Sequence, residues 1–201
     1  MATFVLVRGG NCDGSAWDKV CQNIEHSEHL CYVVDLPDEH TSDLSEHIDC
    51  VFDAILALEN EKITLIGHGY EGLVITGAAA LCPTRINNIV YIDAAVPLPG
   101  QSLFDIFAEA GVDPLTFTDL EALAPYLEKL HFNPLEISHL RKDFIQCTQS
   151  IFLPVTKISQ KNLSQEILGG QWGNHSLNTT HNAMETLPSL VGALLIKSLC
   201  P

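Results

Sequence analysis

The sequence predicts a single domain in which a mostly parallel, doubly wound sheet of about six strands is covered by helices on both faces. Three observations point to this α/β fold. Short apolar runs alternate with helical patterns, the runs end in turns containing glycine or proline, and 46% of the 201 residues are hydrophobic. Alternating strands and helices favour parallel strands joined by right-handed crossovers, and a chain of this length fits one hydrophobic core.

The first two predicted strands are the apolar runs FVLV, at Phe4–Val7, and CYVV, at Cys31–Val34. The first run ends in the turn RGG and the second in the turn DLP. Unbroken apolar runs bounded by turn residues are typical of parallel strands that are buried on both faces. The segment Ser15–Asn23, between the two runs, is predicted to form the first helix.

The second predicted helix has the clearest start in the sequence. Its apolar residues recur at helical spacing, at Leu44, Ile48, Val51, Ile55 and Leu58. Asp43 precedes them, and Glu46 follows three residues later, which resembles a capping box with Asp in place of the usual Ser or Thr. We therefore expect this helix to begin directly after Asp43.

Strands and helices continue to alternate through the first half of the chain. Ile63–Ile66 predicts a strand, Leu73–Leu81 a helix and Ile89–Ile92 the next strand. The stretch from Pro97 to Arg141 breaks this order with helical patterns and scattered prolines. We interpret it as a small helical cap, at about 97–141, inserted over the C-terminal edge of the sheet within one domain.

The last part of the chain restores the α/β order. Phe144–Cys147 predicts a strand, Val155–Leu168 a helix, and a short strand is expected near His175. A final helix is expected after Pro188. We find no internal repeat and no separate linker, so residues 1–201 are predicted to form one unit.

The charge of the chain narrows its partners. Twenty-five acidic and ten basic residues give a formal net charge of −15, which repels phosphate backbones and acidic lipid surfaces. We therefore expect neither nucleic acid nor a membrane as a partner, and no apolar run approaches the roughly 20 residues of a membrane span. The seven cysteines are an odd number without a C-x-x-C pair, and no signal peptide is recognisable. Reduced thiols and a cytoplasmic location are the expectation.

The turns that follow the strands are where chemistry is expected, because ligands of open α/β sheets bind at the carboxyl ends of the strands. Four stretches stand out: FVLVRGGNCDGSAW, LIGHGYEGLVITGAA, IVYIDAAVPLPGQS and TTHNAM. In order and spacing they resemble the α/β-hydrolase superfamily, and within it the small branch of esterases and hydroxynitrile lyases that includes plant methylesterases. The resemblance covers nearly the whole chain and implies the α/β-hydrolase fold.

The same resemblance shows that the nucleophile is missing. The family's elbow turn reads G-H-S-x-G-G, so Gly69 stands in the place of the catalytic serine and Glu71 in the place of a glycine. Arg8 replaces a histidine beside the loop that helps to form the oxyanion hole. In subtilisin, loss of the nucleophilic serine costs about 10⁶-fold in turnover. An engineered exchange explains Gly69 alone, whereas natural loss of the mechanism explains the three departures together.

His181, in TTHNAM, occupies the position of the family's general base, but the family's usual acid is missing. After the strand that ends at Cys147 the chain offers only Gln149 and Ser150. Asp93, after the strand IVYI, is either a substitute acid that orients His181 or an aspartate that forms a hydrogen bond with a turn below the pocket. Both interpretations of Asp93 remain open at this point.

Other reactive side chains have simpler interpretations. Cys12 is either an alternative nucleophile or a small residue that fills a turn, and His68 is interpreted as a packing residue because the family has a histidine there beside a working serine. No H-E-x-x-H or comparable ligand set occurs, so we expect no metal and no cofactor.

The sequence therefore predicts a pseudo-hydrolase that binds a small apolar or ester-like molecule without hydrolysing it. Its binding residues are expected at Arg8, Gly9, Gly10, Tyr70 and Glu71. One alternative is an enzyme in which His181, with or without Asp93, acts as general base on a substrate or on water. The others are an inactive relic that serves as an interaction surface, and an engineered inactive esterase.

Arg8 and Glu71 carry opposite charges on either side of the former oxyanion site. One expectation is that they form an ion pair within about 4 Å across this site. The alternative is that each side chain turns outward to water.

Overall fold

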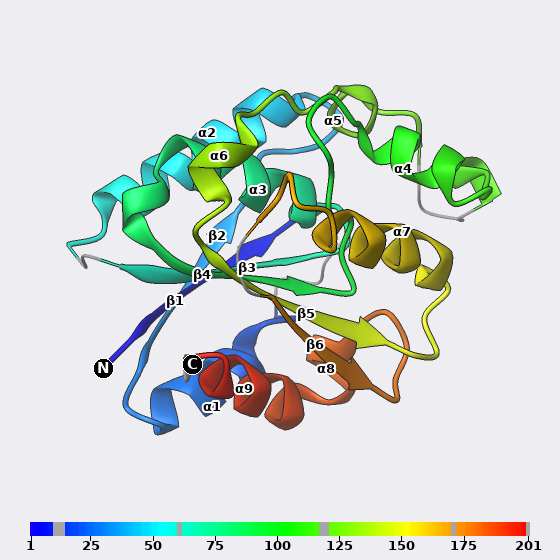
Figure 1. Cartoon of the computed structure of the whole chain (residues 1–201). Helices are drawn as coiled ribbons and strands as arrows, with labels where there is room; N and C mark the ends of the chain where they lie inside the picture. Colours follow the sequence, from blue (N-terminus) through cyan, green and yellow to red (C-terminus); the bar gives the residue numbers. More distant parts are fainter. Residues whose placement is uncertain (10–14, 60–61, 117–120, 170–171, 200–201) are drawn as a thin grey trace.

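A six-stranded parallel sheet forms the centre of the molecule (Figure 1). The computed structural model describes residues 1–9, 15–59, 62–116, 121–169 and 172–199. Within these residues the strands are β1 (Thr3–Arg8), β2 (Leu30–Asp35), β3 (Ile63–His68), β4 (Ile86–Ile92), β5 (Arg141–Cys147) and β6 (Trp172–Leu177). Their order in the sheet is β2-β1-β3-β4-β5-β6, and every pair is parallel. The predicted fold class is confirmed.

Helices cover both faces of this sheet. On one face lie α1 (Asp18–His26) and α9 (Pro188–Lys197), and on the other lie α2 (Leu44–Ala57), α3 (Glu71–Leu81) and α7 (Leu153–Leu163) (Figure 1). Because alternate side chains of a strand point to opposite faces, β1 supplies both layers: Leu6 packs with α1 and α9, and Val7 with α2 and α3. The short elements η1 (Pro83–Arg85) and α8 (Ala183–Thr186) precede β4 and α9.

The start of α2 is as predicted. Asp43 is the N-cap residue, its side chain accepts a hydrogen bond from the backbone N–H of Glu46, and the Glu46 side chain accepts one from the backbone N–H of Asp43. This capping box satisfies two backbone donors that have no partner within the helix.

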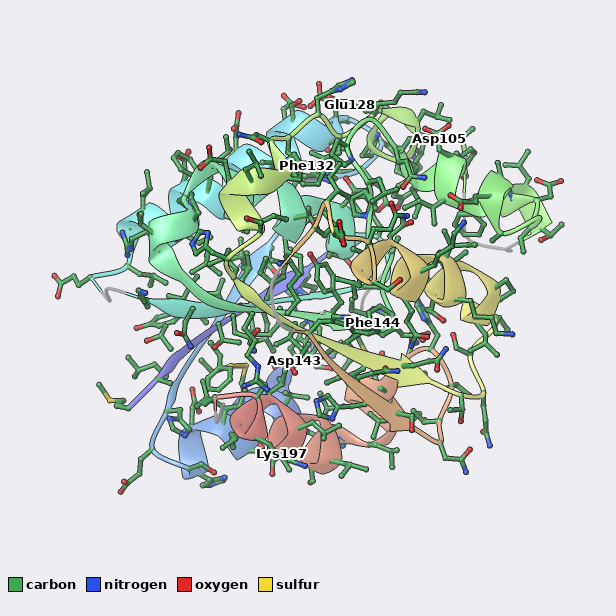
Figure 2. The ribbon with its side chains drawn as sticks, in the orientation of Figure 1. Asp105, Glu128, Phe132, Asp143, Phe144 and Lys197 are labelled. Atoms are coloured by element: carbon green, nitrogen blue, oxygen red, sulfur yellow. A yellow bond between two sulfur atoms is a disulfide. The ribbon has the colours of Figure 1, made fainter. Side chains whose placement is uncertain are left out.

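Two strands begin earlier than the sequence predicts, because polar residues at their starts are buried and paired. β4 begins at Ile86 rather than Ile89, and β5 at Arg141 rather than Phe144. Asn88 of β4 donates a hydrogen bond of 2.7 Å to Asp143 of β5, and both side chains are fully buried (Figure 2). Because these paired residues are polar, the first residues of β4 and β5 do not belong to an apolar run, and the sequence gives no signal for them.

The segment between β4 and β5 contains α4 (Leu103–Glu109), η2 (Pro114–Thr116), α5 (Ala124–Leu127) and α6 (Pro134–Ile137). α4 packs on α7, α5 on α2, and α6 on α3. Glu128 accepts a 2.8 Å hydrogen bond from the backbone N–H of Leu44 at the start of α2, which ties the segment to this helical layer (Figure 2). The interpretation of this segment as a cap over the C-terminal edge of the sheet stays a prediction.

One expectation about the cysteines is wrong. Cys21 of α1 and Cys31 of β2 form a disulfide with a Cα–Cα distance of 5.5 Å, so not all thiols are reduced. The two residues are brought together because α1 packs beside β2. Within the described part of the chain, no helix is long and apolar enough to cross a membrane.

The strand order places one particular pair of turns side by side. The chain goes from β1 outward to β2, then returns to the other side of β1 to form β3. Ligands of doubly wound sheets bind where the order reverses in this way, at the carboxyl ends of the two strands. Here these ends lead into Gly9 and into the turn after His68, where the sequence predicts the site.

Candidate functional site

The turn from β3 into α3 has the sharp geometry of a nucleophile elbow. Gly69 has φ +58°, a left-handed conformation that glycine adopts without strain. Its carbonyl accepts a 2.9 Å hydrogen bond from the backbone N–H of Ala95, which holds the turn against the loop after β4. At Gly72 an added Cβ would lie 2.1 Å from the carbonyl oxygen of Ala95, so this close approach requires a glycine.

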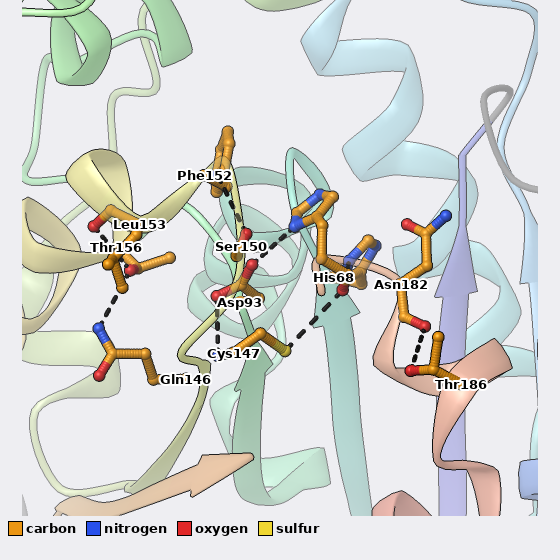
Figure 3. Close-up of polar contacts among 11 residues, drawn as sticks. His68, Asp93, Gln146, Cys147, Ser150, Phe152, Leu153, Thr156, Asn182 and Thr186 are labelled. Carbon is orange, nitrogen blue, oxygen red and sulfur yellow. Dashed lines mark hydrogen bonds and ion pairs between the residues drawn. The ribbon is translucent and has the colours of Figure 1, made fainter. Parts of the chain in front are cut away.

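His181, in the loop between β6 and α8, is held by Asp93. Its Nδ1 lies 2.7 Å from Oδ2 of Asp93, and Oδ1 of the same carboxylate accepts a 3.0 Å hydrogen bond from the backbone N–H of Cys147 (Figure 3). Asp93 is fully buried and has φ +44°. Since a carboxylate only accepts, Nδ1 carries the proton, and in the neutral imidazole Nε2 is then an acceptor.

His68 supports His181 from below. Its Nε2–H donates a 3.1 Å hydrogen bond to the carbonyl oxygen of His181, and the two rings lie 4.1 Å apart. Burial, with a smaller contribution from the charge of His181, lowers the pKa of His68 well below its ordinary value. His68 is thus a buried supporting residue, in agreement with its interpretation as structural.

The imidazole of His181 faces the position of the missing side chain. A Cβ placed on Gly69 would lie 3.3 Å from Nε2 of His181. A serine hydroxyl at this position would therefore be within hydrogen-bond reach of the base. The side chain of His181 is 27% exposed, so the ring can be reached from outside the core.

Glu71 also lies close to this position, since a Cβ on Gly69 would lie 3.9 Å from its Oε2. Its side chain accepts hydrogen bonds from the backbone N–H of Gly9 and from its own backbone N–H. A Cβ on Gly9 would overlap with Oε1 of Glu71, which shows how closely the carboxyl lies against this loop. Burial raises the pKa of Glu71 to about 8, and the negative charge of Glu39 acts in the same direction. The group is therefore mostly protonated at neutral pH.

The expected ion pair between Arg8 and Glu71 is wrong. Among the described ion pairs, Arg8 binds Asp35 at 2.5 Å. The two residues end neighbouring parallel strands in register, Arg8 in β1 and Asp35 in β2, so they meet at the edge of the sheet. Glu71 has backbone donors and does not need the guanidinium.

Tyr70 points away from His181, toward α2 and the segment after β4. Its hydroxyl lies 3.0 Å from Nδ1 of His47, and its ring contacts that of Tyr126 edge-on at 4.9 Å. His47 is itself buried and lies 2.6 Å, through Nε2, from the hydroxyl of Ser42. We did not predict this chain of contacts, although His47 falls on the apolar stripe of its helix, three residues after Leu44.

Known proteins resemble this chain in sequence over about half its length and in fold over nearly all of it. No protein-family model matches the chain. A carbendazim hydrolyzing esterase from Nocardioides sp. (strain SG-4G) is 33% identical over 119 residues, which are 55% of this chain and 49% of that protein. Polyneuridine aldehyde esterase from Rauvolfia serpentina is 33% identical over 111 residues, 50% of this chain and 41% of that protein. The matched regions thus span about half or less of these relatives.

Solved structures share the fold along almost the whole chain. An extracellular α/β-hydrolase from a Paenibacillus species has a TM-score of 0.77 at 20% identity, with 98% of each chain covered. The crystal structure of polyneuridine aldehyde esterase has a TM-score of 0.76 at 16% identity, with 99% of this chain and all of that chain covered. The chain therefore has the fold of these α/β-hydrolases and is similar in sequence to methylesterase-like proteins.

At the position where α/β-hydrolases usually have their acid, the chain has no carboxylate. Ser150 accepts a hydrogen bond from the backbone N–H of Phe152, and the side chain of Gln149 donates to Asn178. The carboxylate that binds His181 is Asp93. This is the contact that the first interpretation of Asp93, as the acid that orients the histidine, predicts. The buried bond of Asp93 to the Cys147 backbone satisfies the structural interpretation as well.

Two predicted residues cannot be placed, and the described residues outside the site form a further groove. Gly10 and Cys12 lie outside the described residues. No group of three potential metal ligands occurs within the described part of the chain. A surface groove of about 600 Å³ lies between α2, α3 and the segment 128–136, and neither Gly69 nor His181 lines it.

Proposed function

We propose that this methylesterase-like α/β-hydrolase does not use the covalent serine mechanism and binds a small molecule non-covalently at the Gly69–His181 site. One observation carries the proposal: the position facing Nε2 of His181 has no hydroxyl, and the carboxyl of Glu71 takes the Gly9 backbone N–H. In α/β-hydrolases, a backbone N–H of the loop that corresponds to the one after β1 here helps to bind the oxyanion.

Each change acts on a different part of the mechanism. Without a hydroxyl at Gly69 no acyl-enzyme can form there. With Glu71 beside Gly9, an oxyanion would have to displace a carboxyl from its backbone donor. Loss of one oxyanion donor costs roughly 10²–10³-fold in turnover, in addition to the loss of the nucleophile.

The proposed ligand is small, uncharged and largely apolar or ester-like. The net charge of −15 disfavours anionic ligands. The names of the relatives support an ester-like shape, since they include a carbendazim hydrolyzing esterase and polyneuridine aldehyde esterase. A cytoplasmic location remains part of the proposal, and the Cys21–Cys31 disulfide, which is more usual in an oxidising compartment, argues against it.

A second candidate function is general-base catalysis without a covalent intermediate. The hydrogen bond of 2.7 Å between His181 and Asp93 favours it, because this contact leaves Nε2 free to accept a proton from a bound substrate or water. In that case turnover depends on His181 and Asp93, and no residue of the protein becomes acylated.

The test combines labelling, turnover and ligand search. We expect no labelling of the purified protein by a fluorophosphonate probe, and ester turnover that is the same in the wild type and in His181→Ala. His26→Ala, at an exposed histidine of α1, is the matched control. Stoichiometric labelling contradicts the proposal. Turnover that is lost in His181→Ala without labelling supports the second candidate. Native mass spectrometry of the protein as purified identifies retained small molecules.

Restoring the serine tests the role of Glu71. Gly69→Ser alone is expected to recover little ester turnover, because the Glu71 carboxyl still binds the Gly9 N–H. Gly69→Ser with Glu71→Gly is expected to exceed the single variant by about 10²-fold, the typical effect of one oxyanion donor. Since Asp93 already holds His181, Ser150→Asp should add little. Full activity of the single variant contradicts this argument.

A further inference from the structure

The missing serine leaves a defined position between two titratable side chains. Measured from the Cβ that a side chain on Gly69 would have, Nε2 of His181 lies at 3.3 Å and Oε2 of Glu71 at 3.9 Å. Apart from Gly69 and its two neighbours in the chain, these are the nearest polar atoms among the described residues. We call this position the Gly69 seat and define it by Gly69, Nε2 of His181 and Oε2 of Glu71.

The two sides of the Gly69 seat offer complementary hydrogen bonds. Because Nδ1 of His181 donates to Asp93, Nε2 presents a lone pair. Oε1 of Glu71 lies against Gly9, while Oε2 faces the seat. A protonated carboxyl that carries its proton on Oε2 therefore presents a donor to the seat, close to the lone pair of His181. A group that fills the seat satisfies both side chains only if it donates to Nε2 of His181 and accepts from Oε2 of Glu71.

We infer that the Gly69 seat binds the hydroxyl group of a small uncharged alcohol or phenol, which donates to Nε2 of His181 and accepts from Oε2 of Glu71. The ligand's hydroxyl then takes the place that a serine hydroxyl would have. The inference rests on the proposed function, since it needs a site that holds its ligand without acylation. It adds the chemical class of the group that the site recognises.

Other groups satisfy only one side of the seat. An ether or ester oxygen accepts from Glu71 but leaves Nε2 of His181 without a donor. A carboxylate can only accept, so it also leaves Nε2 of His181 without a donor, and its negative charge would lie beside the buried carboxyl of Glu71. A hydroxyl satisfies both sides, and the 27% exposure of the His181 side chain gives it access. Water has the same chemistry, so the test compares alcohols with their ethers in water.

The test is an NMR titration of the full chain with ring-labelled ¹⁵N histidine. The probes are ethanol, 2-propanol, phenol and benzyl alcohol, each beside its methyl ether. We expect at least one alcohol to shift the His181 ring resonances and to bind about tenfold more tightly than its ether, which is the typical effect of one unpaired buried acceptor. If no alcohol shifts these resonances, or if ether and alcohol bind equally, the inference is wrong.

Three variants separate the seat from its surroundings. Gly69→Ser fills the seat and is expected to abolish the preference for the alcohol. Gly111→Ser is the matched control, because Gly111 also has a positive φ (+69°) and nothing lies within 4 Å of an added Cβ. Glu71→Gln keeps a donor through its amide and is expected to retain alcohol binding. Loss of the preference in Gly111→Ser, or its survival in Gly69→Ser, contradicts the inference.

The pH dependence gives an independent readout. Alcohol binding is expected to fall as the pH rises through about 8, since deprotonated Glu71 no longer donates. Glu71→Gln should remove this fall. Among the described residues, the titratable groups near Glu71 are Glu39, Tyr70 and His181, and they remain in the variant. The two failures can be told apart. Labelling by the fluorophosphonate probe refutes the proposed function, whereas the absence of alcohol binding in an unlabelled protein refutes only this inference.

Discussion

Glu71→Gln is expected to remove a large pH dependence of the stability. Burial raises the pKa of this carboxyl from 4.5 to about 8. The folded state thus holds the proton more tightly than the unfolded state does. Its contribution to stability is fully present below about pH 4.5 and is lost as the pH rises through 8. At about 1.4 kcal/mol for each pH unit, this difference amounts to roughly 5 kcal/mol.

The glutamine variant separates the proton from the hydrogen bond. Its side-chain oxygen can still accept from the Gly9 N–H, and it does not titrate. The variant and the wild type should therefore have similar stability at pH 4.5, while at pH 9 the variant should be more stable by several kcal/mol. The pH dependence caused by other buried groups, such as His68 and Lys142, is common to both proteins and cancels in the difference.

Urea unfolding at pH 4.5, 7 and 9 measures this difference, with the fluorescence of the buried Trp17 as one signal. Glu25→Gln, at an exposed position of α1, removes the same charge without burial and should show no comparable change. A difference between wild type and Glu71→Gln that is the same at all three pH values refutes the reasoning, because Glu71 would then titrate alike in the folded and unfolded chains.

Three further changes test separate parts of the structure. Asp93→Asn should invert the tautomer of His181, since an amide N–H₂ facing Nδ1 moves the ring proton to Nε2, and ¹⁵N ring shifts report this. Asp43→Ala should cost about 1 kcal/mol of unfolding free energy through loss of the capping box, measured in urea. Reduction of Cys21–Cys31, which closes a short loop with a separation of 10 residues, should cost about 3 kcal/mol, an effect absent when both are serine.

The parts of the fold that the sequence predicts well are those with local signals. The strands that cross the core are apolar runs, and α2 has both periodic apolar residues and a capping box. The starts of β4 and β5 lack such signals. Asn88 and Asp143 are polar, and their burial is explained only by the hydrogen bond between two strands that are 55 residues apart.

The candidate site divides in the same way. Gly69 and His181 could be predicted because motif order fixes the turns in which they lie. The contact between His181 and Asp93 was one of two alternatives, because it joins residues 88 positions apart. The partner of Arg8 could not be predicted without the register of β1 and β2, which places Asp35 beside it.

On the proposed function, the departures at Gly69 and Glu71 belong together. Once the serine is lost, the backbone N–H of Gly9 has no oxyanion to bind, and a buried donor without a partner is costly. The carboxyl of Glu71 satisfies this donor, and its raised pKa allows it to do so without a buried charge at neutral pH. If Glu71 came first, its contact with Gly9 would have lowered turnover before the serine was lost.

The retention of His181 and Asp93 has a separate physical reason. Asp93 satisfies the buried backbone N–H of Cys147, and the carbonyl of His181 accepts from the buried ring of His68. Together these contacts fix the loop before α8 to the ends of three strands. Removing the Asp93 side chain would leave the Cys147 N–H unpaired, and removing the His181 side chain would leave Oδ2 of the buried Asp93 without this donor, whether or not the site performs chemistry. These contacts thus stabilise the fold through the His181–Asp93 pair independently of any catalytic role of the base.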